Sequence, residues 1–115
     1  MQPVKLDVHL ERGSNGTPTV AKLEGKLSLE TVSQFLQTMR PQPSASLVLD
    51  MSGVSFLDSA GVGALVQLFV HRRTVGQKFA LAALTQQGNA VMQVSGLLKL
   101  MPVFASVAEA QQQAG

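Results

Sequence analysis

The sequence predicts one α/β domain, with a mixed and mainly parallel sheet of four to five strands and about four helices. Three observations support this fold class. The chain has 115 residues, the size of a single domain. Hydrophobic residues make up 45% and charged residues 14%, which excludes a disordered chain. Strand-like segments alternate with helix-like segments after an initial hairpin. We expect a core over about residues 4–110 and a flexible tail over 111–115.

The first two segments predict the hairpin. Residues 4–10 alternate apolar and polar side chains, which is the period of a half-buried strand. Residues 13–18 are rich in Gly, Asn and Pro and predict a turn. Residues 19–25 then resume a strand pattern, so the two strands are expected to pair.

The first helix is expected to begin at Ser28, an N-cap, with Glu30 in its first turn, where the helix dipole favours an acid. Pro41 and Pro43 end it. Its apolar side chains recur at the spacing of one helical face: Val32, Phe35, Leu36 and Met39.

A second strand region follows. Residues 47–49 are a continuous apolar run, typical of a strand covered on both faces. We expect Asp50 to close this strand, with its side chain bonded to N–H groups of a following loop. Ser52 and Gly53 predict the turn in that loop.

The central helix is expected to open near Asp58 or Ser59, either of which is suited to cap it. Arg72 and Arg73 fall where a helix C-terminus favours cations, and Gly76 is the expected C-cap. The remaining segments predict a buried strand, a helix, a short strand and a final helical turn or two: 79–82, 85–95, 103–104 and 106–112.

Composition excludes several function classes. The chain has no Cys, so disulfide scaffolds, Cys zinc sites and thiol catalysis are excluded. The net charge is only +2, and the one basic cluster is a pair, so direct nucleic-acid binding is not expected. Neither phosphate-binding glycine motif occurs, and no cofactor or metal is predicted. Without a secretory signal or a long apolar run, we expect a cytoplasmic protein with no membrane insertion.

An enzyme hypothesis depends on Ser59 as a nucleophile. The stretch Leu57-Asp58-Ser59-Ala60-Gly61 lacks the first Gly of the G-x-S-x-G motif. The two histidines, His9 and His71, are not placed beside it by the sequence. A hydrolase is therefore disfavoured, and we expect a protein that is not an enzyme.

Residues 47–68 read LVLDMSGVSFLDSAGVGALVQL. This stretch resembles the STAS domain of anti-sigma factor antagonists, also called anti-anti-sigma factors. Residues 22–27 resemble the family's second strand and its Gly turn, and residues 95–110 resemble its C-terminal end. The resemblance spans about residues 5–110. It implies the STAS (SpoIIaa-like) fold for a single domain over residues 1–115.

The resemblance also implies a function in transcription regulation by partner switching. Ser59 would be phosphorylated by an anti-sigma factor that is itself a serine/threonine kinase and binds the ATP. The unmodified protein would bind that kinase and release the sigma factor, the phosphoprotein would dissociate, and a phosphatase would reset the switch. A weak homodimer is a further expectation. The residues expected to form the switch loop and partner-binding surface are Asp50, Ser52, Gly53, Asp58, Ala60, Gly61, Gly25 and Ser28.

Alternatives remain at this point. Ser59 could act only as a helix cap. The same fold serves as an adaptor subunit of lipid-transport ABC ATPases and in stress-signalling complexes. Ser28 stands where many family members carry an acidic residue. The resemblance therefore does not extend to any role that such a carboxylate has near the partner's nucleotide. A response-regulator receiver is disfavoured, because Asp7 stands alone among the early strand residues.

Two features of the central helix have two interpretations each. Its outer side, with Ala64, Gln67 and His71 flanked by Leu68 and Val70, is small or apolar. That side is either an exposed docking strip or is buried under a neighbouring helix. The glycines of the first turns, Gly61 and Gly63, indicate either tight internal packing or the close approach of another backbone.

Overall fold

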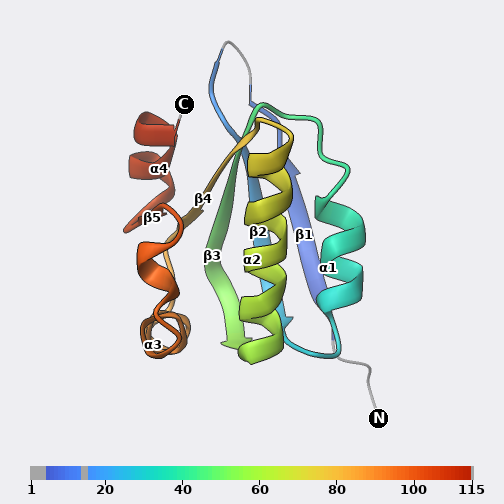
Figure 1. Cartoon of the computed structure of the whole chain (residues 1–115), viewed down its shortest axis with the longest axis vertical. Coiled ribbons are helices and arrows are strands. Elements are labelled where there is room, and N and C mark those ends of the chain that lie inside the picture. Colours follow the sequence, from blue (N-terminus) through green and yellow to red (C-terminus); the bar gives the residue numbers. More distant parts are fainter. Residues whose placement is uncertain (1–4, 14–15, 115) are drawn as a thin grey trace.

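The computed structural model describes residues 5–13 and 16–114. Val4, Ser14 and Asn15, which belong to the predicted hairpin, lie outside these ranges. The strands of the described residues are β1 (Leu6–Glu11), β2 (Thr19–Leu27), β3 (Ser46–Leu57), β4 (Lys78–Ala82) and β5 (Val103–Phe104). The helices are α1 (Val32–Met39), α2 (Ser59–Thr74), α3 (Gln86–Val94), the 3₁₀ turn η1 (Leu97–Lys99) and α4 (Val107–Ala114) (Figure 1).

The strands form one sheet in the order β1-β2-β3-β4-β5. β1 pairs antiparallel with β2, and the three other neighbouring pairs are parallel. The predicted mixed, mainly parallel sheet and its N-terminal hairpin are thus confirmed. The parallel strands run toward the end of the molecule where α2 begins, at the bottom of Figure 1.

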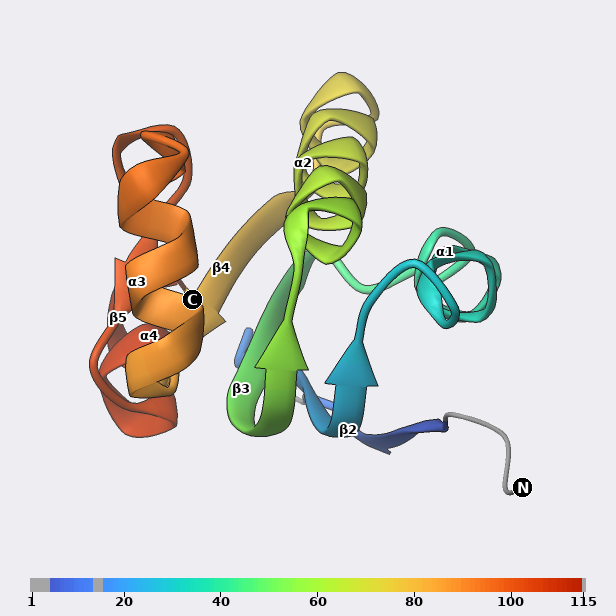
Figure 2. The ribbon, with the colours of Figure 1, turned by 90° about the horizontal axis from the view of Figure 1, so that it is seen from below.

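Helices cover both faces of the sheet. The larger core lies under α1, α2 and α3, and α1 and α2 can be seen on one side of β2 and β3 in Figure 2. A smaller cluster joins α4 to the opposite face through Val20, Val48, Ala80, Ala82 and Ala110. Residues 47–49 of β3 are fully buried, which confirms the prediction of a strand covered on both faces.

The start of α1 differs from the prediction. The helix begins at Val32, and Ser28 is not its N-cap. Ser28 lies in a preceding turn, in which its carbonyl accepts from the Thr31 N–H at 2.9 Å and its N–H donates to the Thr31 Oγ1 at 3.0 Å. Glu30 is therefore an exposed residue ahead of the helix rather than part of its first turn.

The predicted turn at Ser52 and Gly53 is also wrong, because β3 continues to Leu57. β2 is longer than predicted and supplies hydrogen-bond partners along this second half of β3. Two register shifts between the strands, opposite β2 residues 22–24 and 25–26, accommodate the extra residues of β3. A bulged strand therefore occupies the place where a loop was expected.

At the other end, α4 extends through residues 111–114, so the expected flexible tail is helical up to Ala114. The C-cap of α2 is Val75, and the predicted cap Gly76 follows it with φ of 77°, the left-handed conformation in which a glycine commonly ends a helix. None of the helices within the described ranges combines the length and the hydrophobicity that a membrane crossing requires.

Candidate functional site

The junction between β3 and α2 positions the sequence-predicted switch serine. Asp58 is the N-cap of α2, with an extended backbone, and its Oδ1 accepts from the Gly61 N–H at 2.8 Å. Its Oδ2 accepts from the Leu29 N–H at 3.1 Å, which ties the loop before α1 to the start of α2. Of the two cap candidates, Asp58 is therefore the cap, and both of its carboxylate oxygens are occupied.

Ser59 is the first residue of α2 and is exposed. Within residues 5–13 and 16–114 its hydroxyl has no hydrogen-bond partner, since Asp58 makes the capping bond in its place. The first turn of α2 carries no acidic side chain. A free hydroxyl thus lies at a helix N-terminus, where backbone N–H groups favour an added anion.

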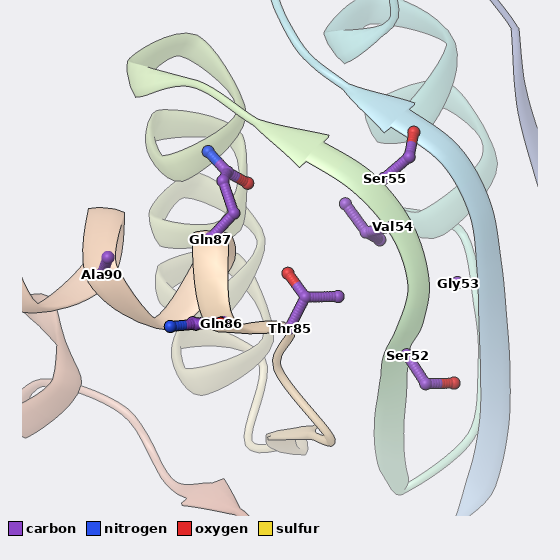
Figure 3. Close-up of a pocket in the computed structure, with 8 residues that line it drawn as sticks. All are labelled: Ser52, Gly53, Val54, Ser55, Thr85, Gln86, Gln87 and Ala90. Atoms are coloured by element: carbon purple, nitrogen blue, oxygen red, sulfur yellow. The ribbon is translucent and has the colours of Figure 1, made fainter.

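A second contact fixes the end of β3. The side-chain amide of Gln87, in the first turn of α3, accepts from the Leu57 N–H at 2.9 Å and donates to the Leu57 carbonyl at 2.8 Å. Figure 3 shows Gln87 projecting from α3 toward this end of the strand. The amide imitates the pairing that a neighbouring strand would give, so α3 holds the residue two positions before Ser59. Gln87 could not be singled out from the sequence, because a glutamine carries no signal that separates this role from simple exposure.

Gly61 and Gly63 prove to have different roles. A Cβ on Gly61 would lie 2.2 Å from the Leu27 carbonyl oxygen, so this glycine lets α2 pack tightly against the end of β2. A Cβ on Gly63 would meet nothing within 4 Å. The first glycine is explained by packing within the domain, while the second leaves open space on the surface.

That open space belongs to an apolar groove of about 590 Å³ between α2 and α3. Ser59 lies in its lining with Val62 and Gly63, opposite Val91 and Val94 of α3. Val94 is 91% exposed, an unusual degree for a valine of an ordered helix. Leu29, in the loop bound by Asp58, is 73% exposed. Apolar side chains are therefore displayed beside the free hydroxyl of Ser59.

The expected docking strip on the outer side of α2 is only partly present. Ala64 and Leu68 are buried and belong to the core, so burial explains two of the five residues of this strip. Gln67 is exposed and accepts a hydrogen bond from the Arg40 guanidinium at 3.0 Å, and Val70 is 51% exposed. The exposed apolar surface is displaced toward α3.

Other predicted site residues lie elsewhere. Asp50 is within β3, and its carboxylate accepts from the Ser52 N–H at 3.0 Å. Eight residues separate it from Asp58, roughly 25 Å of extended chain, so it does not support the turn at Ser59. Ser52 and Gly53 line a cavity of about 620 Å³ between β3 and the start of α3 (Figure 3). Residues 24–27 form the end of β2, and Ser28 follows in the turn before α1.

The last three predicted site residues, Gly25, Ser28 and Ala60, lie in different parts of the structure. Gly25 lies within β2, where its φ of 120° requires glycine. Ser28 is buried and does not contribute an exposed side chain to the expected surface. Ala60 is half-buried next to Ser59. Asp58, Ser59, Ala60 and Gly61 lie together at the start of α2, and Ser28 lies in the adjoining turn, between Leu27, which packs against Gly61, and Leu29, which donates to Asp58. The other candidates, Asp50, Ser52, Gly53 and Gly25, lie within the strands and apart from this turn.

The two histidines are both remote from Ser59. His71 is twelve residues further along α2, which is about 18 Å at the helical rise. His9 is exposed on β1 and pairs with Lys22, in the half of the sheet away from Ser59. The arrangement provides no imidazole base for nucleophilic chemistry at Ser59.

The chain belongs to the STAS domain family, whose model matches residues 10–110. A structure of an anti-sigma factor antagonist from Mycobacterium paratuberculosis is similar, with a TM-score of 0.85 and 21% identity over 98% of this chain and 97% of that one. The anti-sigma factor antagonist SpoIIAA in its unphosphorylated form gives 0.75 and 23% over 93% and 95%. A sulfate transporter family protein from Wolinella succinogenes gives 0.76 and 15% over 90% and 88%. These likenesses agree with the STAS fold of the chain.

Proposed function

We propose that this protein is an anti-sigma factor antagonist that binds an anti-sigma factor with serine/threonine kinase activity and is released when Ser59 is phosphorylated. In this proposal it is a regulatory protein without enzymatic activity of its own, and the partner supplies the ATP. A phosphatase restores the unmodified form. The protein acts on transcription through this partner and not by binding nucleic acid.

One observation carries the proposal: the exposed, unbonded hydroxyl of Ser59 lies in the lining of an apolar groove. Capping of α2 is performed by Asp58, so Ser59 is not needed as a cap. A serine that serves neither the core nor the cap is suited to modification. The groove and the exposed Leu29 and Val94 provide apolar surface for a partner to cover.

The effect of a phosphate follows from its surroundings. A phosphoserine carries about −1.5 to −2 charges, and the N–H groups at the start of α2 favour that charge by roughly 0.3–1 kcal/mol. Asp58 repels it, so the two local effects largely cancel and the fold is retained. When a partner covers the apolar groove, the same charge must be desolvated or face the partner's acids, which costs several kcal/mol. Phosphorylation therefore acts on binding and leaves the domain folded.

The deciding experiment uses the anti-sigma factor kinases encoded with this protein in its own genome, purified and incubated with ATP. We expect phosphate on Ser59 by mass spectrometry, and binding by isothermal titration calorimetry that is at least tenfold weaker for the phosphoprotein. Ser59→Ala should bind but not accept phosphate. Asp58→Asn, which keeps the serine and the oxygen that caps Gly61, is the matched control for phosphorylation. If phosphate appears only at other residues, or if phospho-Ser59 binds as tightly, the proposal is wrong.

A constitutive adaptor role is the second candidate, because the apolar groove can dock a partner without any change at Ser59. The similarity to a structure of a sulfate transporter family protein favours keeping this candidate. It predicts that Ser59 is unmodified in growing and in stressed cells, and that Ser59→Glu binds its partner as the wild type does. Occupancy of Ser59 that changes with growth condition separates the two candidates.

A further inference from the structure

The C-terminal end of α2 lines a further cavity, which the proposed function does not use. Its volume is about 390 Å³, within the range of small-molecule sites. It lies beside the first residues of β4, where β5 does not reach: β5 pairs only with Leu81 and Ala82. Elements distant in sequence converge there, including the last turns of α2, the start of β4, and the ends of β5 and α4.

Aromatic side chains gather in this cavity. The whole chain has five phenylalanines and no Trp or Tyr, and three of the five, Phe69, Phe79 and Phe104, line the cavity. The rings of Phe69 and Phe79 are 6.1 Å apart and tilted by 51°. Phe79 is buried, whereas Phe69 and Phe104 are half-buried and leave ring surface accessible. The cavity therefore offers an apolar floor to a ligand.

The polar part of the lining is cationic. Arg73 and Lys78 are exposed, and neither forms an ion pair within the described residues. The remaining polar residues of the lining are the amides Gln77 and Gln113, so none of the lining residues in the described part of the chain is acidic. Glu109 lies one turn earlier on α4 and is not part of the lining.

A buried cation, Arg72, lies next to the cationic part of the lining. The Arg72 Nε donates to the Lys78 carbonyl at 2.9 Å, and the Arg72 side chain is fully buried. The Lys78 N–H donates to the Ala45 carbonyl at 2.8 Å, so the backbone of Lys78 is fixed from both sides. The backbone of the lining is thus held in place, and its two charged side chains among the described residues are both cationic.

We propose that this cavity binds a small organic anion, a carboxylate or sulfonate on an aromatic or acyl body. The body would lie on the phenylalanine rings, and the anionic group would face Arg73 and Lys78. The concave shape favours a free molecule over a membrane surface. Ser59 is fourteen residues from Arg73 along α2, about 21 Å at the helical rise, so this cavity is separate from the proposed switch.

The test uses the ¹⁵N-labelled full chain titrated with naphthalene-2-sulfonate and, separately, with decanoate below its micelle concentration. We expect amide shifts concentrated at Gln77–Phe79 and Phe104. The neutral naphthalene-2-sulfonamide should bind about tenfold more weakly, because it lacks the charge that Arg73 and Lys78 recognise.

Two double variants complete the design. Arg73→Gln with Lys78→Gln should weaken naphthalene-2-sulfonate binding by about tenfold or more. Arg12→Gln with Lys99→Gln removes the same net charge from exposed residues outside the cavity and should bind as the wild type does. Ser59→Glu should also leave binding unchanged, which keeps this test independent of the proposed function.

Four results would overturn the proposal. The first is the absence of shifts at millimolar probe. The second is shifts centred on the groove between α2 and α3. The third is an equal loss of binding in both double variants. The fourth is co-sedimentation with phosphatidylglycerol vesicles that the cavity variant abolishes, which would assign the cations to a membrane surface instead.

Discussion

The two ends of α2 differ in the exposure and the hydrogen bonding of their polar side chains. At the N-terminal end, Ser59 is exposed and unbonded, beside an apolar groove. At the C-terminal end, Arg72 is fully buried, and its guanidinium donates to the carbonyls of Lys78 at 2.9 Å, Ser44 at 2.7 Å and Gln42 at 3.4 Å. One end of the helix keeps a polar group available to other molecules, while the other end uses a polar group to join three segments of the chain.

This difference shows that the role of a polar side chain depends on its surroundings and not only on its position in a helix. Burial lowers the pKa of Arg72 from its ordinary value, which reports the desolvation cost of its charge. The three carbonyl acceptors offset that cost. Arg72 and Arg73 both lie in the last turn of α2, as predicted, but Arg72 is buried against these carbonyls whereas Arg73 is exposed.

The largest expected effect is at Arg72. Arg72→Met keeps much of the side-chain volume but leaves three carbonyls without their donor, so we expect the free energy of unfolding to fall by about 3 kcal/mol. Urea denaturation monitored by circular dichroism measures it. Arg73→Met is the matched control and should change stability by less than about 0.5 kcal/mol. Equal effects of the two changes would remove the contrast between the buried and the exposed arginine.

The next effect compares two glycines at the N-terminal end. Gly61→Ala places a Cβ against the Leu27 carbonyl and should destabilise the domain by about 2 kcal/mol. Gly63→Ala meets open space and should stabilise it by up to about 1 kcal/mol through helix propensity. Thermal unfolding distinguishes the signs. Under the proposed function, Gly63→Ala should also weaken partner binding by narrowing the groove, a loss that stability cannot explain.

A smaller effect is expected at the cap. Asp58→Ala removes the acceptor of two backbone N–H groups, those of Gly61 and Leu29, and should cost about 1–2 kcal/mol. Asp58→Asn retains one acceptor oxygen and should cost less. The unfolding midpoint in urea gives both values. A cost for Ser59→Ala that matched Asp58→Ala would mean that Ser59, and not Asp58, caps the helix in solution.

The smallest effect is expected at Ser59 itself. Ser59→Glu adds a negative charge that the helix N-terminus favours and Asp58 opposes, so stability should change by less than about 0.5 kcal/mol. Differential scanning calorimetry of Ser59→Glu and Ser59→Gln, which differ in charge and hardly in shape, isolates the electrostatic part. A large destabilisation by Ser59→Glu alone would show that phosphorylation unfolds this region instead of acting on binding.

Local patterns predicted the elements whose signals are local. The apolar run at residues 47–49 and the glycine that ends α2, Gly76, both agree with the structure. The second half of β3 could not be predicted in this way. Ser52 and Gly53 are turn formers, and only pairing with β2, which itself extends to Leu27, keeps them in a strand.

The candidate site shows the same division. The run from Asp58 to Gly61 is contiguous in sequence, so its members had to lie together. Contacts between distant segments, such as the Gln87 amide on Leu57, depend on how α3 packs and leave no trace in the local pattern. Asp50 was expected at the start of a loop, but β3 continues past it to Leu57, so the strand separates Asp50 from the turn at Ser59.

The order of strands in the sheet bears on how the chain is made. Each strand lies beside the one that precedes it in sequence, so a polypeptide leaving the ribosome N-terminus first can add every new strand to the edge just formed. No strand has to insert between two that are already paired. The sheet can therefore grow in one direction during synthesis, and the two-residue β5 with α4 closes it last.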